Sequence, residues 1–421
     1  YRPICPFKQV VRKEYTNVGY FRYLPLIWLI LLGSSPVFSQ PADEQPPALR
    51  MGYGVLSATD LTNPAIRSLG AGIYNNWRTD SAPVAPDGMQ FAQTVRVHQI
   101  LTCPLNSENA WNRDACPYAE PHSYQVRPAL TDIAAIAQAQ PSSLWLIGNE
   151  MDRRDWHLGG QDEMLPELYA TAYHDIHTAI KTADPTAQVA IGGLIQATPL
   201  RLAWLDRMWE SYSQQYGEPM PVDVWNVHNF ILREVFQSYG ADIPPGFASD
   251  DARATVYESD WTHIDLGLFD QQIRAFRAWM AARGQQEKPL IVSEYGVLYR
   301  HCVIWRWTGE EWVCDQNFND EQVVVDFMLA TFDYFLNERD CTLGYVADGC
   351  RLVQQWLWFS LDHPANGFNS HTRLYDSAND ALTPAGIAFR DWVAAHRAAL
   401  AQPIPTDDRL YIFLPNIAKS E

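Results

Sequence analysis

The stretch SLWLIGNE, residues 143–150, decides the fold of this chain. Its apolar run, Leu144 to Ile147, shows no polar alternation, which indicates a strand buried on both faces. The run ends at Gly148, and the polar residues Asn149 and Glu150 follow it. Burying two such polar groups costs free energy unless something uses them. A second Asn-Glu pair, Asn337–Glu338, closes a predicted helix, so the dipeptide alone decides nothing.

Seven further segments show the same features of a buried strand, and helical patterns separate most of them. The eight predicted strands are 50–55, 72–77, 93–100, 143–148, 188–193, 222–228, 289–294 and 352–360. The clearest helix has an apolar face at Leu266, Phe269, Ile273, Phe276 and Met280, after Asp265 as N-cap. Eight strand–helix units predict an α/β chain folded as a (β/α)8 TIM barrel. A doubly wound open sheet is the alternative, but the turn after the first strand lacks G-x-G-x-x-G.

The two ends of the chain have their own composition. Basic residues precede the apolar run 24–33, which is too short to span a bilayer, so we expect a cleavable signal peptide over 1–39. An uncleaved membrane anchor is the alternative. A Pro-rich linker follows over 40–48, then the predicted barrel over 49–400. Residues 401–421 form a linker and a short apolar tail that packs on the barrel or serves surface attachment.

Cysteine usage agrees with a secreted or extracytoplasmic protein. Beyond Cys5, six cysteines fall into three neighbouring couples, and the simplest pairing is 103–116, 302–314 and 341–350. Six cysteines permit 15 pairings, so the sequence leaves the connectivity open.

Charge and missing motifs exclude several classes of partner. The net charge of −18 argues against nucleic acid and anionic membranes. We expect a monomer with no stable membrane span. G-x-S-x-G, P-loop and H-E-x-x-H motifs are absent from the sequence, and we expect neither a metal nor an organic cofactor.

Two glutamates carry the predicted chemistry. In a barrel the site gathers at the carboxyl ends of the strands, where Glu150 ends the fourth and Glu294 the seventh. Strands four and seven face each other across the barrel mouth. Two carboxyl groups in one pocket suit glycoside hydrolysis, in which one is protonated and the other ionised. Salt-bridged strand ends are the structural alternative.

The segments LIGNE and IVSEYG resemble the acid/base and nucleophile motifs of the retaining (β/α)8 glycoside hydrolases of clan A. The resemblance covers about residues 50–400. It implies Glu150 as acid/base, Glu294 as nucleophile and Asn149 as a ligand of the substrate 2-hydroxyl. It also implies a tryptophan floor at strand eight, for which Trp358 is preferred over Trp356.

Other candidate carbohydrate contacts are less specific. The clan often has His-x-Tyr on strand six, where this chain has His228 but Phe230. Either Tyr295, Tyr299 or Asn229 then orients the nucleophile, or the nucleophile is positioned differently. Trp77, Arg96 and His98 end the second and third strands. The segment CVIWRWTGEEWVC, 302–314, predicts a hairpin whose tryptophans either wall a sugar cleft or pack on the barrel.

The predicted function is therefore secreted hydrolysis of a β-linked polysaccharide or oligosaccharide by double displacement. A non-catalytic glycan-binding barrel at the cell surface is the alternative. The glycan, its linkage and endo or exo action stay open, because loops between the strands decide them.

Overall fold

A computed structural model describes residues 48–405 except 58, 105–106, 109, 156–159, 258, 300–301, 318–320 and 365–370. The predicted signal peptide and most of the predicted linker and tail lie outside these residues. Parallel strands form a barrel: β1 Ala48–Gly54, β2 Ala71–Asn75, β3 Gln90–Gln99, β5 Leu144–Asn149, β6 Gln188–Gly193, β7 Trp225–Val227, β8 Leu290–Tyr295 and β11 Gln355–Trp358.

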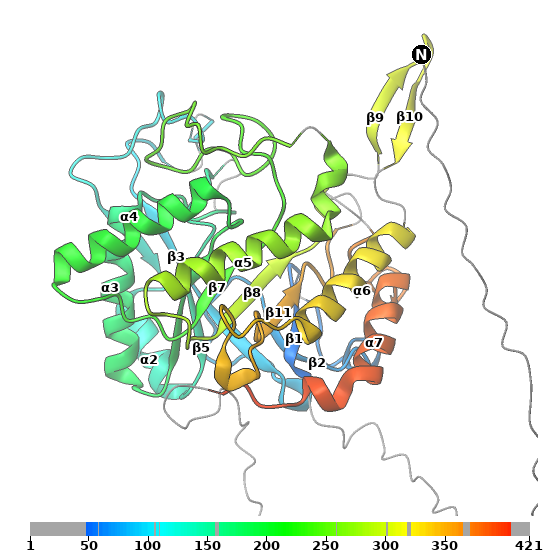
Figure 1. Ribbon diagram of the computed structural model, residues 1–421, viewed down its shortest axis with the longest axis horizontal. Helices are drawn as coiled ribbons and strands as arrows, with labels where there is room; N and C mark the ends of the chain where they lie inside the picture. Colours follow the sequence, from blue (N-terminus) through cyan, green and yellow to red (C-terminus); the bar gives the residue numbers. More distant parts are fainter. Residues whose placement is uncertain are drawn as a thin grey trace, which may run out of the picture. The chain divides into compact units, whose positions relative to one another are not determined.

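The strands close on themselves. They pair in the order β6-β5-β3-β2-β1-β11-β8-β7, and the parallel bridges Ala190–Val224 and Leu194–Val227 join β6 to the segment of β7. Figure 1 shows the strands enclosed by the helices. The predicted (β/α)8 barrel is confirmed, and β5 and β8 are its fourth and seventh strands. An added strand that the sequence did not predict, β4 Tyr124–Arg127, pairs antiparallel with β3.

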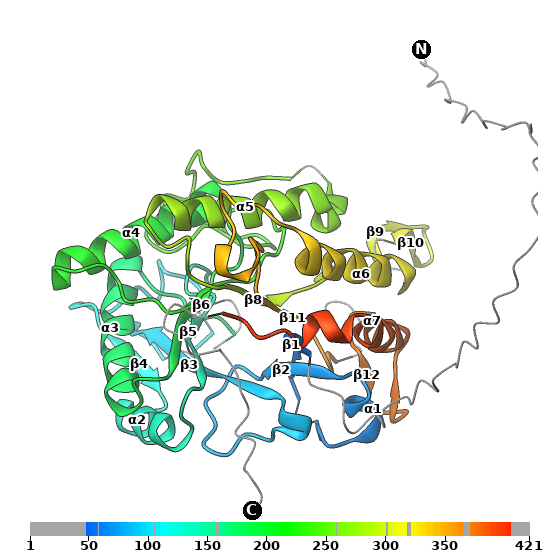
Figure 2. The same ribbon diagram turned by 60° about the horizontal axis from the view of Figure 1, so that its bottom comes forward.

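Helices cover the outside of the barrel (Figures 1 and 2). They are α1 Pro64–Arg67, α2 Leu130–Ala139, α3 Pro166–Ala183, α4 Pro199–Tyr216, α5 Leu266–Ala282, α6 Glu321–Asn337 and α7 Pro384–Leu400. The helix over 266–282 begins where its cap predicts, because the Asp265 side chain accepts a hydrogen bond from the Leu268 N–H. Among the described residues, three short 3-10 helices, Pro86–Gly88, Asp260–Ile264 and Val346–Asp348, lie in connections.

Two small hairpins complete the described structure. Strands β9 Cys302–Trp307 and β10 Trp312–Asn317 form the predicted hairpin, which stands off the barrel near α6 (Figure 1). Strands β12 Tyr375–Asp376 and β13 Ala381–Leu382 form the other.

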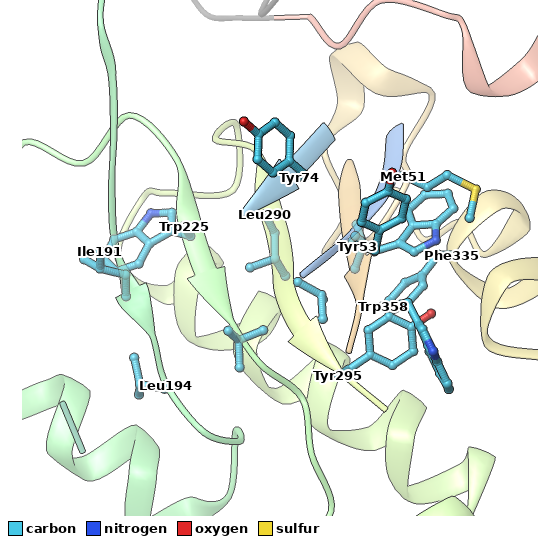
Figure 3. Close-up of a cluster of buried hydrophobic side chains, with 14 of the residues drawn as sticks. Met51, Tyr53, Tyr74, Ile191, Leu194, Trp225, Leu290, Tyr295, Phe335 and Trp358 are labelled. Atoms are coloured by element: carbon cyan, nitrogen blue, oxygen red, sulfur yellow. The ribbon is translucent and has the colours of Figure 1, made fainter. Parts of the chain in front are cut away.

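Side chains alternate between the barrel interior and the helix layer. The interior is filled by small and branched residues: Ile73, Ala92, Leu144, Leu146, Ala190, Val224, Ile291 and Leu357. Their neighbours along the strands, such as Trp145, Trp225 and Trp356, pack outward under the helices. Figure 3 shows part of this outer layer, in which the rings of Tyr295, Phe335 and Trp358 lie together. Burial on both sides explains the uninterrupted apolar strands.

The residues after α7 close the amino-terminal end of the barrel. Ile404 is 1% exposed and packs in the interior cluster with Ile73, Leu144 and Ile291. The backbone oxygen of Pro403 accepts a hydrogen bond from Arg50, which also pairs with Asp348 at 2.7 Å. Ile404, which falls in the linker and tail expected over 401–421, is therefore a core residue and not part of a free linker.

Disulfides join Cys103 to Cys116 and Cys341 to Cys350, as predicted. The predicted pair 302–314 lies outside the side chains that the structure describes. In the described part of the chain, no helix is both long and apolar enough to cross a lipid bilayer.

Truncating the side chain that closes the barrel tests this account of the tail. We expect Ile404→Ala to lower the free energy of unfolding by about 2–5 kcal/mol, because it leaves a cavity in the interior cluster. Urea unfolding followed by tryptophan fluorescence measures the change. The matched control is Ile387→Ala on α7, where the side chain is 43% exposed and the expected change is within about 0.5 kcal/mol. Equal effects of the two substitutions would contradict the role given to Ile404.

Candidate active site

Glu150 points into the barrel because it continues the inward alternation of β5. Leu144 and Leu146 face the interior, and Glu150 follows them by six and four residues, on the same side. Its φ of 50° is left-handed, and its N–H donates to the oxygen of Gly193 at 3.0 Å. The strand thus ends in a turn that fixes the direction of this carboxylate.

Glu294 reaches the same space through an irregularity in β8. Since Ile291 faces inward, strict alternation would turn Glu294 out toward the helices. The pairing with β11 shifts, however: Val292 opposes Trp356, whereas Tyr295 opposes Trp358, so β8 carries one extra residue. Such bulges re-aim side chains near functional sites. Glu294 can therefore line the cavity while Tyr295 packs outside.

His228, just after β7, lies between the two carboxylates. Its Nδ1 is 3.1 Å from Glu150 Oε1 and 3.8 Å from Glu294 Oε2. One ligating atom from each of these three residues lies within 4.8 Å of the others, and all three residues are buried. The structure therefore brings together the two glutamates that the sequence placed on strands four and seven.

Each carboxylate has its own hydrogen-bond donors. Glu294 Oε2 accepts from the Trp77 indole at 3.0 Å. Glu150 Oε2 accepts from Arg153 at 2.9 Å and from the Gln161 amide at 3.1 Å. The Trp77 ring has room because residue 54 is a glycine: a Cβ there would lie 2.5 Å from the ring. A cation thus faces Glu150, and a neutral donor faces Glu294.

These surroundings separate the pKa values of the pair. Burial, with a smaller contribution from the charge of Glu150, raises the pKa of Glu294 to about 7. Burial acts in the same direction on Glu150, but Arg153 and His228 outweigh it and lower its pKa to about 2. Burial alone would lower the pKa of His228, yet the two glutamates raise it. Glu150 is therefore the more readily ionised member of the pair in the free site.

The pair lies in a cavity of about 570 Å³, within the range of small-ligand sites. Apolar and aromatic side chains form much of its wall, and polar groups gather around the glutamates. The lining residues are Leu56, Trp77, Arg96, Asn149, Glu150, Arg153, Gly160, Gln161, Gln237, Ser238, Tyr239, Gly240, Glu294, Leu298 and Phe359. This composition suits a ligand with both apolar faces and hydroxyl groups.

Three of the remaining predicted residues lie at or beside the cavity. Asn149 lines it, and its side-chain amide donates to the oxygen of Gly160 at 3.0 Å. Arg96 also lines it and holds Asp162 at 2.9 Å. His98 is 3% exposed, with Nε2 at 3.0 Å from Asp162, and is not among the lining residues. His98 therefore lies outside the cavity and contacts Asp162, the carboxylate that pairs with Arg96.

Trp358 and Tyr295 are placed away from the cavity. Both lie in the outer layer, with ring centroids 5.3 Å apart, and the Trp358 indole donates to the oxygen of Thr372 (Figure 3). The expected floor at Trp358 is corrected by alternation: Leu357 faces inward, so the residue that reaches the cavity is Phe359. The Tyr295 hydroxyl lies 3.3 Å from Thr331, so Tyr295 does not orient Glu294.

The residue that holds Glu294 is Trp77, which the sequence suggested only as a general contact. The other candidates are occupied elsewhere: Asn229 donates to the oxygen of Phe269, and Tyr299 packs on His263. Four further residues at the cavity were not predicted from the sequence: Arg153, Gln161, Tyr239 and Phe359. Of these, Arg153 alone had a signal in the sequence, because it follows Glu150 by three residues.

The tryptophans proposed for the hairpin lie largely outside the description. The side chains of Trp305 and Trp312 are not described, whereas Trp307 is described and 51% exposed. Trp307 is not among the lining residues of the cavity. The predicted wall of hairpin tryptophans therefore has no described residue at the cavity.

Glu150, His228 and Glu294 are also the one group of three potential metal ligands among the described residues. The Arg153 guanidinium, 2.9 Å from Glu150, puts a permanent positive charge beside this group. That charge opposes binding of a divalent cation, and it favours acid–base use of the two carboxyl groups.

No family model matches this chain, and no curated protein matches its sequence. Similar solved structures include a GH128 endo-β-1,3-glucanase from Amycolatopsis mediterranei, at 16% identity and a TM-score of 0.46, covering 82% of this chain and 99% of that one. A glucosidase from Croceicoccus marinus is 14% identical with a TM-score of 0.44, covering 83% and 67%. Cel5A from Thermotoga maritima is 11% identical with a TM-score of 0.38, covering 84% and 99%.

Replacing Trp77 by Phe tests how Glu294 is held. The indole hydrogen bond lowers the pKa of Glu294, so its loss should raise that pKa from about 7, by roughly one to two units for a bond worth about 1.5–3 kcal/mol. Carbon-13 NMR of labelled glutamate carboxyls measures the titration. Trp307→Phe, on the exposed hairpin residue, is the control and should leave it unchanged. A Glu294 titration that is identical in Trp77→Phe and the wild type would refute this contact.

Proposed function

We propose that this chain is a secreted glycoside hydrolase that cleaves a β-linked glycan with retention of configuration. The observation that carries the proposal is the buried pair Glu150–Glu294, with carboxylate oxygens within 4.8 Å at the cavity. Retaining enzymes place these groups about 5–5.5 Å apart, whereas inverting enzymes leave about 6.5–9.5 Å for a water molecule. The close approach supports double displacement.

The reaction then proceeds in two steps. Glu294 attacks the anomeric carbon while Glu150 gives its proton to the glycosidic oxygen, so the C–O bond breaks and a glycosyl ester forms. Glu150, now ionised, takes a proton from water. The resulting hydroxide equivalent attacks the anomeric carbon and releases Glu294. Asn149, at the cavity, is the proposed ligand of the 2-hydroxyl.

The first step needs the opposite protonation from that of the free site. Glu294 must be ionised to attack, and Glu150 must carry the proton. His228, within 3.1 Å of one carboxylate and 3.8 Å of the other, is positioned to pass that proton between them. Binding of a sugar beside Glu150 must therefore weaken the pairing with Arg153.

The nature of the cavity supports a carbohydrate. Trp77 and Phe359 meet edge to face, with centroids 5.8 Å apart, and Tyr239 and Leu298 add apolar surface. Apolar surface covers the faces of sugar rings, and Arg96, Gln161 and Gln237 offer polar groups to the hydroxyls. The proposed export and the two described disulfides fit an enzyme that meets its glycan outside the cell.

Removing each carboxyl group separately tests the two roles. We expect Glu294→Ala to lower kcat/KM by more than about 10⁴-fold, because the covalent route is lost. Glu150→Ala should cost about 10²–10⁴-fold on a polysaccharide and much less on aryl glycosides whose leaving group needs no proton. Product analysis on a panel of β-glucan, xylan, mannan and galactan, with matched aryl glycosides, provides the measurement.

The matched control is Glu338→Gln, which alters the chain's second Asn-Glu pair. Glu338 is paired with Arg274 at the end of α6, so activity should be unchanged. Azide then assigns the roles: it should give a glycosyl azide of retained configuration with Glu150→Ala and of inverted configuration with Glu294→Ala. The reverse pattern would exchange the roles. Sugar binding without turnover in the wild type would favour a glycan-binding protein.

Chelation tests whether the same three side chains work without a metal ion. We expect turnover to be unchanged after dialysis against EDTA, because general acid and nucleophile both come from carboxyl groups. Initial rates before and after dialysis, with metal content measured by mass spectrometry, provide the comparison. Loss of activity that Zn²⁺ or Mn²⁺ restores would contradict the carboxylate mechanism.

A further inference from the structure

Arg153 makes two contacts that join different parts of the site. Its Nη1 donates to Glu150 Oε2 at 2.9 Å, and its Nη2 donates to the backbone oxygen of Gly240, also at 2.9 Å. The side chain is 17% exposed and lines the cavity. One rigid guanidinium therefore spans from the end of β5 to the long connection after β7.

Residues 237–240, here called the wall segment, all line the cavity. The Tyr239 hydroxyl donates to the oxygen of Leu298 at 3.1 Å. Arg233 donates to the oxygen of Tyr239 at 3.0 Å and to the Ser238 hydroxyl at 3.2 Å. The wall segment is thus held by Arg233 from its own connection, by Leu298 from the connection after β8, and by Arg153 from the catalytic side.

Gly240 lets the wall segment approach. Its φ of 133° is unfavourable for residues with a side chain, and a Cβ would lie 2.3 Å from the oxygen of Arg233. The bare backbone at this position presents its carbonyl oxygen to Arg153.

We propose that Arg153 is a positioning residue that ties the wall segment to the carboxylate of Glu150, so that the state of this wall and the protonation of Glu150 depend on each other. The catalytic meaning of this tie rests on the proposed function. Reciprocity follows from linkage: if the tie favours ionised Glu150, then protonation of Glu150 must weaken the tie to the same extent.

The groups that face Glu150 come from several elements. Arg153 and Asp152 follow it in the chain, His228 comes just after β7, Glu294 from β8 and Arg96 from β3. Asp152 and Glu294 oppose its ionisation, whereas Arg153 and His228 favour it. Of the favouring groups, Arg153 is the one that also holds the wall.

Arg153→Met, Arg153→Lys and the matched control Arg233→Met test the proposal in the full-length protein. Arg233 holds the same wall segment without contacting Glu150. Two readouts need no turnover: carbon-13 titration of Glu150, assigned with Glu150→Gln, and amide hydrogen exchange over residues 237–240.

We expect Arg153→Met to raise the pKa of Glu150 by about one unit or more and to increase exchange in the wall segment. Arg153→Lys keeps the charge, so it should restore the titration more fully than the protection from exchange. Arg233→Met should increase exchange with a much smaller effect on Glu150. With a cleaved glycan, the acidic limb of kcat/KM should move to higher pH in Arg153→Met alone.

Either of two results in Arg153→Met would overturn the proposal: an unchanged Glu150 titration, or unchanged exchange in the wall segment. An equal shift of Glu150 in Arg233→Met would also overturn it, because the effect would then come from the wall and not from the guanidinium. If the wild type hydrolyses no glycan, the proposed function fails, and the titration and exchange measurements still decide the tie.

Discussion

Two carboxyl groups buried within 4.8 Å of each other constrain the whole mouth of this barrel. At that distance, and with an effective dielectric constant of about 20, two full charges repel by about 3.5 kcal/mol, enough to move a pKa by two or more. The pair must therefore hold a proton or a compensating cation at neutral pH. The chain supplies both: Arg153 compensates Glu150, and burial leaves Glu294 with the raised pKa. His228 lies between the two carboxylates and interacts with both of them.

Residues at one end of the barrel stabilise the fold, whereas residues at the other end form the candidate active site. At the amino-terminal end, Ile404 fills the interior, and Arg50 joins Asp348 to the residues after α7. These contacts are apolar, or they pair opposite charges. At the opposite end, the strands finish in left-handed or bulged residues that expose carboxylates to a cavity. The apolar interior below is what makes ionisation of those carboxylates depend so strongly on their few neighbours.

The sequence was enough for the barrel and for the meeting of Glu150 with Glu294, because buried parallel strands read as uninterrupted apolar runs and end at one face. Predictions from the sequence were wrong where the direction of a side chain depended on how the strands pair. A bulge in β8 has no sequence signature, so Tyr295 was expected at the site although it packs outside. Counting inward from Leu357 gives Phe359, not Trp358, at the cavity. Trp77 and Arg153 depend on turns whose geometry only the fold determines.

The electrostatics of the free site also explain why it holds an arginine that works against the proposed acid. Without Arg153, the unequal contacts of His228 and the Trp77 indole would remain to decide which of the two buried carboxyl groups holds a proton. With Arg153 in place, the proton resides on Glu294, which cannot attack a sugar in that form. A substrate that separates Arg153 from Glu150 would therefore let the proton move from Glu294 to Glu150. This one event would give a protonated acid and an ionised nucleophile. Because the same guanidinium holds Gly240, that event would also release the cavity wall, so occupancy of the cavity and readiness of the carboxyl pair would change together.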